Sequence, residues 1–170
     1  LDIIRPAGTA GPAPVMVYVH GGGWTGGDPQ QQGREMYHAL ARDGWIVAAI
    51  RYPFAPAVSV EQQIAIVTDA VRWVRTASAE HIDAPTAVVL AGGSAGAHLA
   101  AMAALAGADD EATIVDACVG IYGVYDMANR NRTRATWTKI PREVMQATVD
   151  DAPERYRAVS PIDQVHAETP

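Results

Sequence analysis

The sequence is poor in the residues from which disulfides and metal centres are built. It contains one cysteine, Cys118, so no disulfide can form within the chain. Its five histidines are dispersed, and no cysteine or histidine pair has the spacing of metal ligands, so we expect no metal site. Cys118 lies inside the apolar run 115–121, which predicts a small, buried hydrophobic residue with an unreactive thiol.

Long apolar runs and basic patches are also missing. No run approaches membrane-spanning length, which predicts that no segment spans a membrane. The formal net charge is −6, and the only clustered cations are Arg130, Arg132 and Arg134, which we interpret as a solvated face. This charge distribution excludes a nucleic-acid partner. No signal peptide precedes Leu1, so the cytoplasm is favoured, although the localisation stays open because residues 1–4 resemble the interior of a strand.

The sequence contains enough apolar residues to form one hydrophobic core. Of its 170 residues, 49% are hydrophobic, which predicts a single domain spanning residues 1–170. Strand-like and helix-like patterns alternate along the chain. Strands are expected at 1–5, 15–19, 45–50, 87–91 and 115–121, and helices at 30–43, 60–76 and 95–106. This alternation predicts the α/β class, with a mostly parallel sheet, helices on both faces and an arrangement that is incomplete at both ends.

The stretch 88–99 is the most informative one. An apolar strand pattern ends, the sequence Gly-Gly-Ser-Ala-Gly follows at 92–96, and an alanine-rich helix pattern begins. A Gly-x-Ser-x-Gly motif between a strand and a helix is typical of a nucleophile elbow, in which the serine is held in a strained turn. We therefore expect Ser94 to be the nucleophile, and Gly92 and Gly96 to be required because the tight turn leaves no room for larger side chains.

A second motif, His-Gly-Gly-Gly-Trp, lies upstream at 20–24 and also follows a strand-like run. Consecutive glycines allow backbone N–H groups to approach a ligand oxygen closely. A phosphate-binding loop would need a Gly-Lys-Ser/Thr sequence, and no lysine is present in this loop. The two motifs together predict both halves of an oxyanion hole.

With these motifs the chain resembles the hormone-sensitive-lipase-like carboxylesterases of the α/β-hydrolase superfamily. The matching segments are HGGGW at 20–24, YPFAP at 52–56, GGSAGAHLA at 92–100, the turn at 122–123 with Asp126, and YRAVSPI at 156–162. The chain departs from the usual pattern at Gly93, where the group has aspartate, and after Tyr52, where it has Arg-Leu. The polar, arginine-rich stretch 128–158 is expected to be an excursion over the carboxyl edge of the sheet, as a lid or part of the acyl pocket.

The resemblance implies a role for each matched residue. Ser94 would be the nucleophile, the backbone N–H groups of Gly22, Gly23 and Ala95 would hold the oxyanion, and His20 would shape the glycine loop by hydrogen bonding. The family places its acid and its base late in the chain, so we expect both to lie beyond residue 170 and the sequence to be an interior portion of the fold.

His98, Asp126 and Trp24 are assigned roles outside the catalytic group. We expect His98 to be a satisfied core histidine, Asp126 to be a turn or cap residue, and Trp24 to pack the glycine loop. His166 is an alternative candidate for the base, whereas His38 and His81 have no assigned role.

The function predicted from the sequence is that of a carboxylic ester hydrolase with a serine acyl-enzyme, a small-molecule ester substrate and no cofactor. Two alternatives remain: an arylformamidase or other amide-type hydrolase, and a catalytically incomplete hydrolase-like protein that binds a small molecule. We also expect self-association, or a C-terminal portion that covers the unpaired edge of the sheet.

Overall fold

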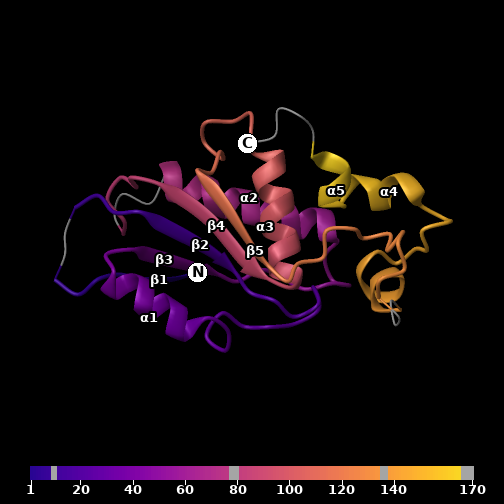
Figure 1. The fold of residues 1–170 in the computed structure, drawn as a ribbon, viewed down its shortest axis with the longest axis horizontal. Coiled ribbons are helices and arrows are strands. Elements are labelled where there is room, and N and C mark those ends of the chain that lie inside the picture. Colours follow the sequence, from indigo (N-terminus) through magenta and orange to yellow (C-terminus); the bar gives the residue numbers. More distant parts are fainter. Residues whose placement is uncertain (9–10, 77–80, 135–137, 166–170) are drawn as a thin grey trace.

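A five-stranded sheet forms the centre of the molecule (Figure 1). The computed structural model describes residues 1–8, 11–76, 81–134 and 138–165. The strands are β1 (Asp2–Ile4), β2 (Val15–Val19), β3 (Ile46–Ile50), β4 (Val88–Gly93) and β5 (Ala117–Ile121), in the spatial order β1-β3-β2-β4-β5. Strand β1 pairs antiparallel with β3, and the other pairs are parallel. The predicted class, a mostly parallel α/β sheet, is therefore confirmed.

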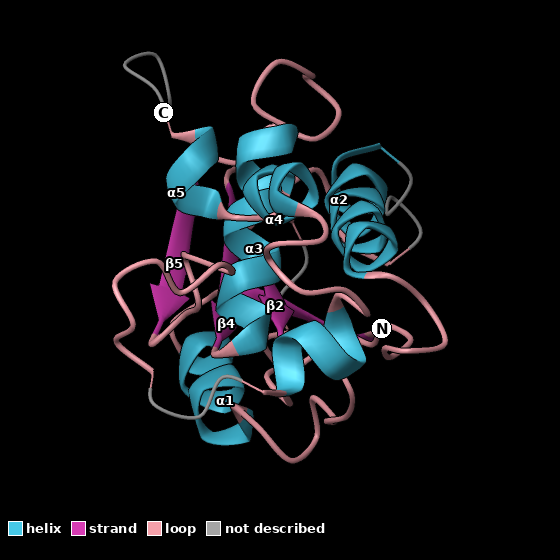
Figure 2. Ribbon diagram, turned by 90° about the vertical axis from the view of Figure 1, so that its right-hand side faces the viewer, coloured by secondary structure: helices cyan, strands magenta, loops and turns pink. Residues whose placement is uncertain are grey.

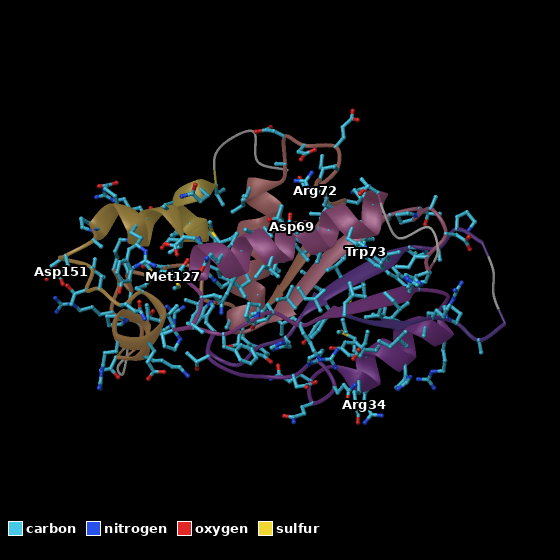
Figure 3. All side chains as sticks on the ribbon, turned by 180° about the vertical axis from the view of Figure 1, so that it is seen from behind. Arg34, Asp69, Arg72, Trp73, Met127 and Asp151 are labelled. Carbon is cyan, nitrogen blue, oxygen red and sulfur yellow. The ribbon has the colours of Figure 1, made fainter. Side chains whose placement is uncertain are left out.

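Three helices cover the two faces of this sheet (Figures 1 and 2). Helix α1 (Arg34–Arg42) lies on one face, and α2 (Val60–Thr76) and α3 (Ala95–Ala106) lie on the other. Figure 3 shows Asp69 and Arg72 on α2 and Arg34 on α1, at opposite sides of the molecule. Because β2 and β3 are covered on both faces, all of their residues are buried, which is why these segments read as continuous apolar runs.

The core is divided by the sheet into two clusters. Alternate residues of β2 point to opposite faces, so Val15, Val17 and Val19 join the larger cluster, formed with α2 and α3. Met16 and Tyr18 join the smaller cluster on the α1 side. The residues that follow the parallel strands consequently gather at one edge of the sheet, where their carboxyl ends meet.

The observed elements differ from the predicted ones mainly at their ends. Helix α1 begins at Arg34 rather than at residue 30, and β4 continues to Gly93, directly before the serine. Burial of Cys118 was a wrong prediction, since all five residues of β5 are exposed and the thiol is free and exposed. The apolar run indicated a strand correctly, but β5 lies at the edge of the sheet beside an open apolar groove of about 470 Å³.

Residues 127–134 and 138–165 lie at one end of the molecule (Figure 1). They contain the π-helical turn η1 (Ile140–Val144) and two short helices, α4 (Pro153–Ala158) and α5 (Pro161–Gln164). Met127 is fully buried in the main core, whereas Asp151 lies at the outer end of this segment (Figure 3). The segment is anchored to α2 by an ion pair between Arg155 and Glu61, with Nε and Oε1 2.6 Å apart.

Candidate active site

Ser94 lies in a strained turn between β4 and α3. Its backbone has φ 54° and ψ −119°, a conformation that side-chain-bearing residues rarely adopt. A Cβ built on Gly92 would lie 2.5 Å from the carbonyl carbon of Gly96, and one on Gly96 would lie 2.1 Å from the carbonyl oxygen of Val19. The strained serine and the crowded glycines expected from the sequence are therefore both present.

The glycine loop lies directly beside this turn. A Cβ built on Gly21 would lie 3.4 Å from the Cβ of Ser94 and 2.9 Å from the carbonyl oxygen of Gly93. Gly22 and Gly23 have φ of 136° and 60°, backbone conformations that glycine adopts without strain. The fold thus brings together two motifs that are about 70 residues apart in the sequence, because they follow the neighbouring strands β2 and β4.

Ala95 follows the serine and is the third residue expected to offer a backbone N–H. It is fully buried and is the first residue of α3, so that its N–H lies at the N-terminus of the helix. The first N–H groups of a helix have no partner within the helix, and the helix dipole favours negative charge at this end. The backbone N–H of Ser94 is instead used structurally, since it donates to the carbonyl oxygen of Ile121 at 3.0 Å.

His20 lies beneath the loop and is buried. Its Nδ1 lies 2.8 Å from the carbonyl oxygen of Gly21, and its ring stacks on Tyr52 with centroids 4.5 Å apart. The Tyr52 hydroxyl in turn donates to the carbonyl oxygen of His20 at 2.8 Å. Burial lowers the pKa of His20, so the ring is neutral at neutral pH and Nδ1–H is the donor to Gly21. This arrangement agrees with a structural histidine that shapes the loop.

His98 joins the glycine loop to the C-terminal part of the chain. The Trp24 indole donates from Nε1 to Nδ1 of His98 at 3.0 Å, and Nε2–H of His98 donates to the carbonyl oxygen of Val159 at 2.7 Å. The ring is completely buried, and burial lowers the pKa of His98 to about 4. The predictions of a satisfied core histidine and of a tryptophan that packs the loop are both confirmed.

Two glutamines that the sequence analysis did not single out also hold the loop. The side-chain oxygen of Gln32 accepts from the N–H of Gly21 at 2.9 Å, and its amide nitrogen lies 3.4 Å from the Gly21 carbonyl oxygen. The Gln63 amide donates to the carbonyl oxygens of Trp24 and Pro53, both at 2.9 Å. Gln63 is fully buried beside Ile64. A polar residue on the apolar face of a predicted helix was the sequence signal that could have revealed the role of Gln63 in holding the loop.

Lys139 is the third contact that the sequence did not reveal. Its side chain crosses Gly23, so that a Cβ built on that glycine would lie 3.1 Å from the Lys139 ammonium nitrogen. Lys139 belongs to the stretch 128–158, and this contact brings the predicted excursion against the glycine loop. The ammonium is half-exposed and lies 4.0 Å from Glu143.

Asp126 is a turn residue, as expected. Its carboxylate accepts from the backbone N–H groups of Ala128 and Arg130 at 3.1 and 2.8 Å. The Arg130 guanidinium pairs with Asp126 and with Asp163, the latter at 2.8 Å. Arg130 is therefore not simply solvated, as the arginine cluster suggested, but ties this turn to α5.

The remaining candidates lie away from the serine or cannot be placed. His81 packs against Trp73 on α2, and His38 belongs to α1. His166 lies outside the described residues. In the part of the chain that the structure describes, no three acidic, histidine or cysteine side chains gather as metal ligands would. Within the same residues, no helix is long and apolar enough to cross a membrane.

Chemically, this geometry suits attack by a serine hydroxyl on a carbonyl carbon. A strained turn holds the serine, and a glycine loop and a helix N-terminus, both sources of free backbone N–H groups, lie beside it. Such donors stabilise the negative charge that develops on the carbonyl oxygen as a tetrahedral intermediate forms.

Comparison with known proteins points in the same direction. The BD-FAE family model matches residues 1–170. The chain is 35% identical to Esterase LipQ of Mycobacterium tuberculosis over 167 residues, 93% of this chain and 40% of LipQ. It is 36% identical to Esterase LipC of the same organism over 170 residues, 94% of this chain and 42% of LipC. The chain thus spans about two fifths of the length of these relatives.

Solved structures extend this likeness to the fold. The native structure of esterase Est2 from Thermogutta terrifontis superposes with a TM-score of 0.75 and 28% identity, over 99% of this chain and 61% of that one. A shorter match, 29% identical over 130 residues, is to the kynurenine formamidase of Drosophila melanogaster, and it covers 75% of this chain and 42% of that enzyme.

Proposed function

The chain belongs to the BD-FAE family and has an α/β-hydrolase fold, and on that premise we propose that it supplies the nucleophile and oxyanion hole of a carboxylic ester hydrolase. The observation that carries this proposal is the conformation of Ser94, strained at φ 54° and set beside the glycine loop. A site that only binds a ligand gains nothing from a strained serine backbone. A nucleophilic serine needs the strained turn, because the turn exposes its hydroxyl.

In the proposed reaction the Ser94 hydroxyl oxygen attacks the ester carbonyl carbon. The carbonyl π bond breaks, and its electron pair moves to the oxygen, which the N–H groups of Gly22, Gly23 and Ala95 stabilise. Collapse of this tetrahedral intermediate breaks the bond to the alcohol oxygen, which takes up the proton that a general base accepted from the Ser94 hydroxyl during the attack, and leaves an acyl-enzyme. Water then attacks the acyl carbon, and a second collapse releases the carboxylic acid and restores the serine hydroxyl.

The general base lies outside the described residues in this proposal. His98 is excluded because both of its ring nitrogens are used in buried hydrogen bonds. His20 is excluded because Nδ1 is bonded to Gly21 and the buried Nε2 makes no hydrogen bond to Ser94. Asp126 is used by its own turn and by Arg130, so it is not a free acid for a triad.

The stretch 128–158 is proposed to cover part of the acyl pocket. Support comes from the contact between Lys139 and Gly23, which places this stretch against the oxyanion loop. The ion pair between Arg155 and Glu61 fixes its far end to α2.

A second candidate function is hydrolysis of an aryl formamide, which the match to kynurenine formamidase favours. The same nucleophile and oxyanion donors would serve, and only the leaving group would change from an alcohol to an amine. Esters have the stronger support because the two mycobacterial esterases match over more of the chain and at higher identity.

The experiment that tests the proposal is active-site labelling of the protein that carries this chain. A fluorophosphonate should attach to Ser94, as peptide mass spectrometry would show, and Ser94→Ala should abolish this label. Hydrolysis of p-nitrophenyl acetate compared with formanilide then separates esterase from formamidase. An unlabelled Ser94 would instead favour the third alternative, a protein that binds a small molecule and leaves it intact.

A further inference from the structure

Two tyrosine hydroxyls converge on the residue that directly precedes the proposed nucleophile. A Cβ built on Gly93 would lie 3.1 Å from the Tyr122 hydroxyl oxygen and 3.6 Å from that of Tyr18. Tyr18 belongs to β2, and Tyr122 follows the last residue of β5, so the two phenols reach Gly93 from the strands on either side of β4. The absence of a side chain at position 93 leaves this space to the two hydroxyls.

Both hydroxyls have unused hydrogen-bonding capacity. Within residues 1–8, 11–76, 81–134 and 138–165, neither phenol oxygen has a hydrogen-bond partner. The Tyr18 side chain is only 5% exposed, yet its hydroxyl oxygen is not among the buried side-chain atoms that lack a partner, so the hydroxyl lies where water or a ligand can reach it. Burial, with a smaller contribution from Tyr122, raises the pKa of Tyr18, so its hydroxyl stays protonated and available as a donor.

The Tyr18 side chain is packed in place, and the Tyr122 backbone is strained. The Tyr18 ring makes an edge-to-face contact with Tyr37, with centroids 5.2 Å apart. Tyr122 has φ 43°, a strained value for a bulky residue, and 78% of it is exposed. Strained residues concentrate at functional sites, and a large exposed aromatic residue beside a nucleophile is well placed to meet a ligand.

We propose that the hydroxyls of Tyr18 and Tyr122 form a polar subsite beside Ser94, which donates hydrogen bonds to an ether, hydroxyl or carbonyl oxygen carried by the substrate next to its ester carbonyl. This inference rests on the proposed ester hydrolysis. Two neutral donors select for an oxygen acceptor, and a substrate that places a methylene group there forms neither of these hydrogen bonds and displaces the water that could otherwise make them. Gly93 is required because any side chain would fill the subsite.

The test compares two p-nitrophenyl esters of equal chain length, the methoxyacetate and the butyrate, which differ by one oxygen in place of a methylene group. The measured quantity is the ratio of their kcat/KM values, each divided by its rate of hydroxide-catalysed hydrolysis. We expect the ratio to favour methoxyacetate and to fall about five- to tenfold in Tyr18→Phe and in Tyr122→Phe, as loss of one hydrogen bond predicts. Tyr125→Phe is the matched control, because its hydroxyl lies against Gly120 and Gly123 instead.

The outcomes separate this inference from the proposed function. If both esters are turned over and neither phenylalanine variant changes the ratio of their kcat/KM values, the subsite proposal is overturned and the proposed ester hydrolysis stands. If neither ester is turned over, the comparison is made with fluorophosphonates that carry a butyl or a 2-methoxyethyl chain, by their rates of attachment to Ser94. A preference for the ether that the two variants remove supports the subsite, and equal rates in all three proteins overturn it.

Discussion

The Trp24 indole donates a hydrogen bond from Nε1 to Nδ1 of His98, at 3.0 Å and inside the core. Trp24 ends the glycine loop, and His98 lies one helical turn after Ser94. The glycine loop and the nucleophile turn meet beside Ser94, and this hydrogen bond joins them a second time, inside the core. Because His98 also donates to Val159, the same ring fixes the C-terminal segment to the nucleophile helix.

We expect Trp24→Phe to destabilise the protein. The substitution leaves Nδ1 of His98 buried without a donor and shortens a side chain that is only 4% exposed. Together these effects should cost about 2–4 kcal/mol in the free energy of unfolding. Urea denaturation measures the change, with Trp73→Phe on α2 as the control. Equal, small losses in both variants would mean that the bond to His98 contributes little.

A second prediction distinguishes the adjacent glycines of the loop. A Cβ on Gly22 would lie 1.9 Å from the backbone oxygen of Gly26, whereas one on Gly23 meets only the flexible end of Lys139 at 3.1 Å. Gly22→Ala must therefore displace the loop, and we expect kcat to fall about 10²–10³-fold, as for loss of an oxyanion donor. Gly23→Ala should cost about 1 kcal/mol of stability and much less activity. Steady-state kinetics and thermal unfolding of both variants provide the comparison, and similar kcat losses would contradict it.

The strain at Ser94 gives a third prediction. With φ 54° and ψ −119°, the serine backbone should be relieved by glycine, so Ser94→Gly should raise the free energy of unfolding by about 1 kcal/mol or more. Ser94→Ala keeps a Cβ and should not share this gain, although both variants lose the nucleophile. Chemical denaturation of the two variants beside the parent measures the difference. Equal stability of the glycine and alanine variants would show that the turn is not strained.

Much of this site could be predicted because short motifs and the parallel sheet dictate it. Gly92, Gly96 and Ser94 are set by a turn that only small residues fit, and the neighbouring strands β2 and β4 bring the glycine loop beside it. The clamps formed by Gln32 and Gln63 could not be predicted, because they depend on loop paths that no local pattern encodes. Cys118 was misplaced for a related reason, since an apolar strand looks the same in sequence at the centre and at the edge of a sheet.

The fourth prediction concerns stability at acid pH and rests on His98. Burial lowers its pKa to about 4 in the folded protein, whereas an unfolded chain has a value near 6.5. Between these values the unfolded chain binds a proton that the folded protein does not, so stability should decrease as the pH falls from about 6.5 to about 4. The full contribution is about 3 kcal/mol, at about 1.4 kcal/mol per pKa unit. His20 contributes in the same direction, since burial lowers its pKa as well.

Replacing His98 by asparagine should remove most of this dependence. Asparagine retains an acceptor and a donor but cannot be protonated, so His98→Asn should be less stable than the parent at pH 7 and lose less stability between pH 6.5 and pH 4. His38→Asn, a substitution on α1, is the control and should follow the parent. The measurement is urea unfolding across this pH range. A slope in His98→Asn as steep as in the parent would place the acid sensitivity elsewhere, with the buried His20 as the next residue to replace.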